Sequence, residues 1–268
     1  MSSDAPLSSL LAAAPPSDQR QVLSIAEEVW SIPYLSQRSV MSFLWQDEAV
    51  ALRAASRACR DAVADHTWED FHEVHPYSRS RIHGSRLAAW RRCFPNARAA
   101  NISENMTITD ADFVYLKGVR KLNMWYCNQL TITDAAFVHL KGIHTLNMGC
   151  CSQSTITDAA FVHLKGIHTL DMAHCYQSTI TDAAFVHLEG IHELNMAFCD
   201  QPTITDAAFA HLKGIHVLDM ELCSQPTITD ATLSHLVGIK DLTLYGCNQF
   251  TSEAIANLRA RGANVKWP

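Results

Sequence analysis

The stretch that decides the fold runs from Thr107 to Leu130 and reads TITDADFVYLKGVRKLNMWYCNQL. Residues 131–154 read TITDAAFVHLKGIHTLNMGCCSQS, and copies continue in phase up to TITDATLSHLVGIKDLTLYGCNQF, which ends at Phe250. A partial seventh copy, TSEAIANLRARGANVKWP, occupies residues 251–268. This 24-residue period predicts a solenoid, because one unit cannot bury its apolar side alone and has to stack on its neighbours.

Each unit carries the signals of a strand, a turn and a short helix. Leu122 and Met124 flank one polar residue, and this alternation predicts a short half-buried strand in every copy. The Asp of each TITD, such as Asp110, stands where we expect the helix N-cap. Phe137 and the Leu three residues later share an inward helix face. Gly142 and its equivalents then end a helix of about two turns.

This pattern resembles the cysteine-containing class of leucine-rich repeats. The resemblance rests on Leu-x-Met, the Cys that follows it, Ile-Thr-Asp and the Phe/Leu-x-x-Leu helix, and it covers residues 86–268. It implies an α/β solenoid, a right-handed horseshoe with strands on the concave side and helices on the convex side. Met replaces the second strand Leu in most copies and fills a similar volume.

Six cysteines recur at one position of the repeat, namely Cys127, Cys151, Cys175, Cys199, Cys223 and Cys247. Because they share one phase, we expect a buried structural ladder rather than a metal site or a nucleophile. Cys150 beside Cys151 is a weak zinc signal, so we predict no metal and no cofactor. Histidines form two further ladders, one in the helices from His139 and one before the strands from His144, which we interpret as scaffold positions or as a pH-dependent surface.

The copies differ from one another mainly within and just after the strand. Drift at unconstrained solvent positions is one explanation, and a binding surface on the concave face is the other. Aromatic residues at these positions favour binding, because Trp and Tyr are frequent interface anchors. Acidic residues in the later repeats predict a partner with Lys or Arg beside an apolar anchor. The candidate substrate-binding residues are Lys121, Trp125, Tyr126, Asp171, His174, Glu193, Phe198, Asp219, Glu221, Asp241 and Tyr245.

The segment before the repeats has a different composition. Residues 1–106 contain eleven Arg and no Lys, which indicates a separate fold. We divide the chain into a flexible tail (1–24), a small all-α domain (25–72), a linker with an irregular entry repeat (73–106), six full repeats (107–250) and a partial repeat (251–268). About forty residues of helix are too few to be stable alone, so this domain should pack on the solenoid or on a partner.

Residues 32–71 resemble an F-box. The resemblance rests on Ile32-Pro33, Val40, Ser42-Phe43-Leu44, Leu52 and Ser56-Arg57-Ala58-Cys59-Arg60. Cys59 replaces the usual Trp, and Ser36 stands where an apolar residue is common. Residues 66–71 are similar to the segment that follows an F-box, and residues 87–103 to an entry repeat. A generic three-helix cap for the solenoid is the alternative.

The F-box resemblance implies the substrate-recognition subunit of a Skp-cullin-F-box ubiquitin ligase. Its concave face would capture a protein substrate, and a recruited conjugating enzyme would supply the catalysis. We expect no enzymatic activity in this chain, and it has no Gly-x-Ser-x-Gly, phosphate-binding loop or His-Glu-x-x-His motif. The residues that would dock on the Skp-type adaptor are Pro33, Leu35, Val40, Leu44 and Leu52.

Two other functional classes are weighed against the ligase subunit. One is a protein-interaction scaffold without a ligase, and the least favoured is a hydrolase that uses Cys150 or Cys151. An F-box before near-identical repeats resembles the expanded families of amoebae and their large DNA viruses.

Composition excludes further classes of partner. The net charge of −6 argues against nucleic acid, and no apolar run is long enough to span a membrane. The first twenty residues lack the features of a secretory signal, and the nine cysteines do not form a secreted disulfide pattern. We therefore expect a reducing compartment, the cytoplasm or nucleus, of the host cell if the source is viral.

Overall fold

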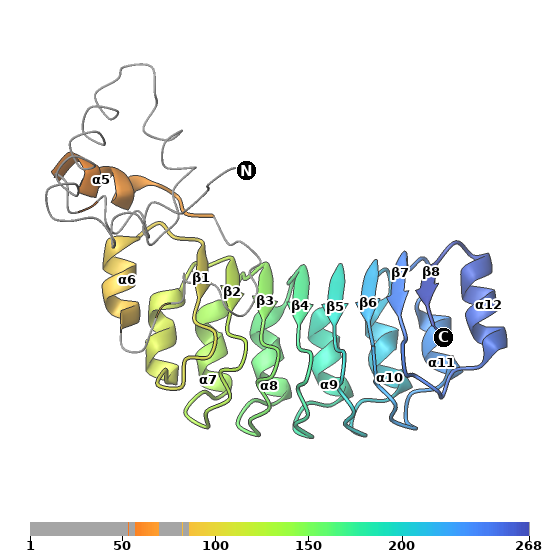
Figure 1. The fold of residues 1–268 in the computed structure, drawn as a ribbon. Coiled ribbons are helices and arrows are strands. Elements are labelled where there is room, and N and C mark those ends of the chain that lie inside the picture. The colour runs from red at the N-terminus through yellow and green to blue at the C-terminus, as the bar shows by residue number, and fades with distance from the viewer. Residues whose placement is uncertain (1–52, 54–56, 70–81, 83–85, 268) are drawn as a thin grey trace, which may run out of the picture.

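The Leu-x-Met segments form the parallel strands that the sequence predicts. In the computed structural model, which describes residues 53, 57–69, 82 and 86–267, eight three-residue strands lie in chain order in one sheet (Figure 1). Equivalent leucines are in register, so that Leu122 pairs with Leu146 and Leu146 with Leu170. The strands are β1 (Ala99–Asn101), β2 (Lys121–Asn123), β3 (Thr145–Asn147), β4 (Thr169–Asp171), β5 (Glu193–Asn195), β6 (Val217–Asp219), β7 (Asp241–Thr243) and β8 (Asn264–Lys266).

Short helices form a second row beside the sheet (Figure 1). A typical repeat helix is one α turn followed by one 3-10 turn, which together give the two turns that the sequence predicts. The α-helices are α5 (Arg57–Asp65), α6 (Leu87–Cys93), α7 (Asp134–Phe137), α8 (Asp158–Phe161), α9 (Asp182–Phe185), α10 (Asp206–Phe209), α11 (Asp230–His235) and α12 (Ser252–Ala260). The 3-10 helices are η2 (Asp110–Leu116), η3 (Val138–Leu140), η4 (Val162–Leu164), η5 (Val186–Leu188) and η6 (Ala210–Leu212).

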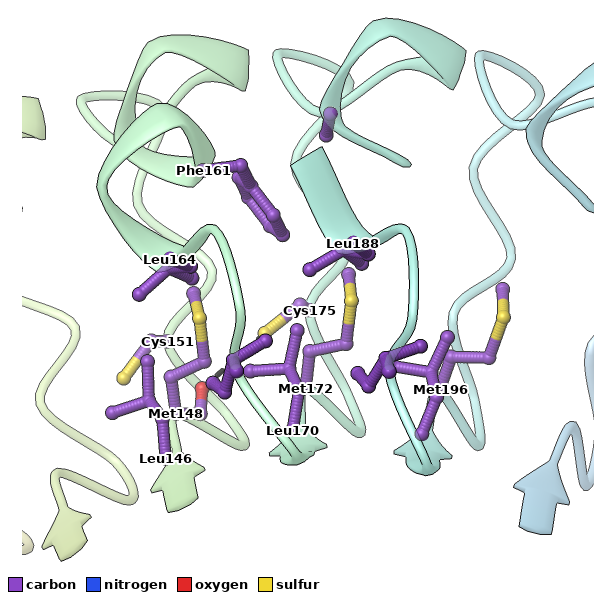
Figure 2. Close-up of a cluster of buried hydrophobic side chains, with 14 of the residues drawn as sticks. Leu146, Met148, Cys151, Phe161, Leu164, Leu170, Met172, Cys175, Leu188 and Met196 are labelled. Atoms are coloured by element: carbon purple, nitrogen blue, oxygen red, sulfur yellow. Dashed lines mark hydrogen bonds between the residues drawn. The ribbon is translucent and has the colours of Figure 1, made fainter. Parts of the chain in front are cut away.

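The core is one continuous column of equivalent side chains between the two rows. Figure 2 shows Leu146, Met148 and Cys151 of one repeat beside their counterparts in the next, with Phe161 and Leu164 above them. All five are at most 1% exposed. Each unit buries its apolar side against its neighbours, which is why a single repeat has no core of its own.

The prediction that the Asp of TITD caps the helix is wrong. The N-cap is the preceding Thr, and in α7 the Thr133 hydroxyl accepts a hydrogen bond from the Ala135 N–H. The carboxylate of Asp134 instead accepts hydrogen bonds from the backbone N–H and the hydroxyl of Thr157 in the next repeat, at 2.8 Å each. Thr and Asp are both good N-cap residues, and here the spacing between repeats decides which one caps.

Two buried ladders also join each repeat to the one before it. The Cys151 thiol donates to the Met124 carbonyl at 3.1 Å, and the other ladder cysteines make the same bond. The Gln153 amide donates to the Cys127 carbonyl at 3.0 Å, as do its counterparts Gln177, Gln225 and Gln249 to the equivalent carbonyls. These bonds satisfy backbone carbonyls and side-chain donors that stacking removes from water, whereas the Oε1 atoms of the glutamines have no partner among the described residues. The Cys ladder is therefore structural, as predicted, whereas the Gln ladder was not predicted.

Aromatic residues close the two ends of the core. On the N-terminal side Trp68 is 1% exposed, packs edge-on against Phe94, and accepts a backbone hydrogen bond from Arg98. At the other end the Trp267 indole donates to the Cys247 carbonyl, the contact that a Gln makes in the inner repeats. Helix α5 and residues up to Glu69 thus pack on the solenoid as one body with it, although they lie in the range expected for the separate helical domain.

We predict that Asp206→Ala lowers the free energy of unfolding by about 1.5–3 kcal/mol, because it removes hydrogen bonds to a charged group. Asp206 accepts from the Thr229 N–H, the Thr229 hydroxyl and the Thr232 hydroxyl. Partial burial raises the pKa of Asp206, but these hydrogen bonds outweigh burial and lower it. The contribution is therefore present above the ordinary carboxyl pKa and disappears as the pH falls through the lowered value.

Urea unfolding of wild type and variants measures this effect. Asp200→Ala, at an exposed position, is the matched control and should change the free energy by less than about 0.5 kcal/mol. Equal effects of the two substitutions would contradict the role of the Asp–Thr bonds.

Candidate functional site

The predicted binding residues occupy four positions in and after the strands. Lys121, Glu193 and Asp241 begin β2, β5 and β7, and Asp171 and Asp219 end β4 and β6. The others lie in the turn that follows the strand. There, one position holds Trp125, Glu221 and Tyr245, and the next holds Tyr126, His174 and Phe198. Because all strands are parallel, these turns meet at one edge of the sheet, which we call the turn edge.

Asp171 and Asp219 also support the backbone. The Asp171 carboxylate accepts a hydrogen bond from the Ala173 N–H at 3.0 Å, and Asp219 accepts from Glu221 at 2.9 Å. Asn123, Asn147 and Asn195 make the same contact. Five of the six full repeats therefore have Asn or Asp at this position, with Thr243 as the exception, and this preference is a constraint of the turn rather than of a ligand. Burial raises the pKa of Asp171, and the charge of Asp219 adds to the increase.

The second turn position has a left-handed backbone. Tyr126, His174, Phe198 and Leu222 have φ between 56° and 60°, a region that normally favours glycine. Their N–H groups hold this conformation, since each donates to the next repeat; the Phe198 N–H, for example, donates to the Glu221 carbonyl at 2.7 Å. The repeated backbone thus directs a series of large side chains to the turn edge at a conformational cost of about 1 kcal/mol each.

The structure brings the central aromatic residues together. The rings of His174 and Phe198 stack with their centroids 4.2 Å apart and 15° between their planes. The His174 Nδ1 lies 2.7 Å from the hydroxyl of Tyr176, which is 54% exposed. We call His174, Tyr176 and Phe198 the central aromatic cluster. Sequence reasoning missed Tyr176, and the one available signal was that this position is Asn or Ser in four of the other five repeats.

Trp125 and Tyr126 form a separate pair in the first full repeat, with ring centroids 5.4 Å apart. Trp125 lies over Gly149, where an added Cβ would be 3.0 Å from the indole Cδ1. Leu222 similarly leans over Gly246 and is exposed. Tyr245, in the last full repeat, is exposed and lies far along the edge from Trp125. Leu222 was not predicted, although it occupies the same repeat position as Phe198.

The predicted acidic residues are not all free to meet a ligand. The Glu193 carboxylate lies 3.5 Å from the His192 Nδ1, and the Asp241 carboxylate accepts from the Asn264 side chain at 2.8 Å. Glu221 forms no side-chain ion pair within the part of the chain that the structure describes. The acidic character of the later repeats therefore depends most directly on Glu221.

The described residues do not assemble a metal centre. Among them, no group of three or more His, Cys, Asp or Glu side chains is placed to hold an ion. All nine cysteines are free, and those of the ladder are at most 1% exposed. Burial raises the pKa of the Cys127 and Cys199 thiols to about 12, so neither is a thiolate at neutral pH. Within the same residues, no helix is both long and apolar enough to cross a bilayer.

Comparison with known proteins supports the fold. No model of a protein family matches the chain, and no curated protein matches its sequence. Human 5T4, also called trophoblast glycoprotein, is similar in structure at 18% identity and a TM-score of 0.53, over 65% of this chain and 71% of its own. A leucine-rich-repeat protein of Leptospira interrogans aligns at 16% identity and a TM-score of 0.49, over 66% of this chain and 44% of its own.

A chain of the yeast Rad7–Elc1 complex aligns at 15% identity and a TM-score of 0.46, over 63% of this chain and 54% of its own. This chain covers about a quarter of other similar structures, 26% for TLR13 and 27% for the Toll–Spatzle complex. Together with the in-register strand and helix units, the likeness to 5T4 identifies the fold as a leucine-rich-repeat solenoid.

We predict that the six ladder cysteines react slowly with iodoacetamide at neutral pH, because their thiols are buried and protonated. Cys150 is half-buried and should be alkylated before Cys151 in the same folded protein. Peptide mass spectrometry over time measures both rates, and unfolding in urea should make them similar. Rapid alkylation of Cys175 or Cys199, or zinc that copurifies at one equivalent, would contradict the structural role.

Proposed function

We propose that this chain is the substrate-recognition subunit of a Skp-cullin-F-box ubiquitin ligase, and that it is not itself an enzyme. Pro33, Leu35, Val40, Leu44 and Leu52, which would bind the adaptor, lie outside the described residues. The proposal draws on the F-box resemblance for the adaptor and on the turn edge for the substrate. It places the protein in the cytoplasm or nucleus, in line with its free cysteines.

The central aromatic cluster is the observation that carries the substrate-binding part. His174 and Phe198 are half-buried by their mutual stacking, so they lose little conformational freedom when a ligand covers them. Exposed Tyr176 and Leu222 extend the same apolar surface. Rigid aromatic groups of this kind contribute most of the energy in protein interfaces. A protein with an apolar anchor is therefore the ligand that best fits the turn edge.

The rigid junction before the solenoid supports a ligase role. Val63 of α5 and Trp68 belong to the same core as the first repeats, and the Asn96 amide donates to the Ala64 carbonyl. Helix α5 contains the end of the F-box-like motif, including buried Cys59. The end of the F-box-like motif is therefore packed against the solenoid that carries the proposed substrate surface, as a ligase subunit that joins adaptor and substrate would require.

A protein-interaction scaffold without a ligase is the second candidate. The same packing favours it, because Trp68 and Phe94 cover the open end of the core as a capping segment does. The two candidates share the turn edge and differ in the adaptor. Binding of a Skp-type adaptor therefore distinguishes them.

We predict that Val40→Asp combined with Leu44→Asp abolishes capture of a purified Skp-type adaptor, because charges would replace two apolar side chains that the F-box resemblance assigns to the adaptor interface. Pull-down with wild-type and variant full chains is the measurement. The solenoid should melt at nearly the same temperature in both, because repeat stability is a nearest-neighbour sum. A wild-type chain that never binds the adaptor would exclude the ligase and leave the scaffold.

We predict that Phe198→Ala weakens substrate binding by about 2 kcal/mol, because it removes one half of the stacked pair. Isothermal titration calorimetry with the partner captured by the full chain is the measurement. His163→Ala, in η4 on the helix side, is the control and should change binding by less than about 0.5 kcal/mol. The reverse ranking would place the binding surface on the helices.

A further inference from the structure

A column of basic side chains lies at the opposite edge of the sheet, just before the strands. Equivalent residues in six successive repeats form it, and we call this set the basic column: Arg120, His144, His168, His192, His216 and Lys240. Backbone hydrogen bonds connect its members in order; the His168 N–H, for example, donates to the His144 carbonyl at 2.9 Å. The repeat backbone therefore fixes the spacing of these side chains and places them in one row along the solenoid.

The four imidazoles in the middle of the column are stacked. Their ring centroids are 4.7, 4.6 and 4.2 Å apart along the series, with 13° to 28° between planes. His144 is exposed and the other three are half-buried. Within the described part of the chain, the rings of His168 and His216 form no hydrogen bond. These ring nitrogens have no hydrogen-bond partner among the residues that the structure describes.

Most charges near the column are also positive and unpaired. Among the described residues, Lys121, Lys141 and Lys165 form no salt bridge, and neither do Arg120 and Lys240. Carboxylates near it are already engaged: Glu193 with His192, Glu189 with His211, Asp241 with Asn264, and Glu69 with Arg98. Partial burial and then the charges of His168, Arg120 and Lys121 lower the pKa of His144. The first repeats of the column therefore have an excess of cations, whereas Glu189, Glu193 and Asp241 reduce that excess in the later repeats.

We propose that the basic column binds an extended acidic segment of a partner protein. Five repeat intervals of about 4.8 Å give the column a length of about 24 Å, which an extended segment of about seven residues would cover. The terminal carboxylates of such a segment would pair with Arg120 and Lys240, and the carboxylates in its middle would contact the four imidazoles. This surface is separate from the turn edge, and the inference does not depend on the proposed ligase function.

The charge around the column favours a peptide over nucleic acid. The net charge of −6 repels any polyanion at long range, so the preference for a peptide depends on the local arrangement of charges. Glu189, Glu193 and Asp241 also border the column, so a wide polyanion would lie against carboxylates. A narrow segment with separated acidic side chains can contact the cations and avoid these groups.

Acidic pH should strengthen this binding. Histidine gains its charge between about pH 8 and pH 5, whereas glutamate in a ligand stays ionised over most of that range. Burial and the charges of His168, Arg120 and Lys121 lower the pKa of His144, and a bound carboxylate would offset the repulsion among these charges. Proton uptake therefore accompanies binding, and the affinity rises as the pH falls.

The test uses the full chain and fluorescein-labelled heptaglutamate at low ionic strength, with anisotropy read at about pH 6 and about pH 8. We expect binding at least about threefold tighter at the lower pH, and none for heptaglutamine. The triple variant His168→Gln, His192→Gln and His216→Gln keeps His144 and should lose most of the pH effect. The matched control replaces His163, His187 and His211 by Gln in the same repeats and should keep it.

A second variant covers the case in which the triple variant misfolds. Arg120→Gln with Lys240→Gln changes two exposed residues at the ends and should weaken binding at both pH values by a similar factor. Thermal melting checks the fold of every variant. Absence of heptaglutamate binding, equal loss in the control triple variant, or tighter binding of an oligothymidylate of equal charge would each overturn the proposal.

Discussion

The hydrogen bonds between Asp and the Thr of the next repeat join helix formation to repeat stacking. Thr157 is the N-cap of α8, and the Asp134 carboxylate fixes that Thr by accepting from both its N–H and its hydroxyl. The same Thr hydroxyl then accepts from the Ala159 N–H at the helix start. A repeat that lacks its neighbour would lose the support of its own cap, so helix and stack are stabilised together. This is the physical form of nearest-neighbour coupling in this solenoid.

The first repeat shows what this coupling requires. Thr109 has no Asp in a preceding TITD, and the carboxylate of Asp112 takes its place by accepting from the Thr109 N–H at 2.9 Å. Four of the five later full repeats have Ala at the position of Asp112, and the last one has Thr232. The substitution at the end of the array is therefore a local replacement for a missing neighbour. At the other end of the array, the Trp267 indole donates to the Cys247 carbonyl, a contact that Gln side chains make in the inner repeats.

The sequence predicts those features that depend on spacing alone. Period, strand position and the Cys ladder follow from the recurrence of Leu122, Met124 and Cys127 in one phase. The exchange of roles between Thr133 and Asp134 could not be predicted, because both residue types cap helices and the choice depends on the distance to the next repeat. The left-handed turn could not be predicted for a different reason. Glycine is the usual signal of such a turn, but five of the six full repeats have another residue there, and Gly246 is the exception. The sequence therefore predicts His174 and Phe198 as site residues, but not their stacking, because the stacking arises from that turn.

The left-handed turn explains why variation and binding potential coincide at the turn edge. Hydrogen bonds to the next repeat fix the backbone at Tyr126, His174 and Phe198. The side chains at this position therefore have no role in forming a helix or a strand, and their type can vary. A large residue in the turn needs space in the next repeat, which Gly149 gives to Trp125 at the first turn position and Gly246 gives to Leu222 at the second. At these two points a large side chain depends on a glycine in the next repeat, whereas His174 and Phe198 are two large neighbours that stack on each other. At the edge before the strands, four successive repeats have histidine at one position, and a backbone ladder of the same kind brings their rings together as the imidazole stack.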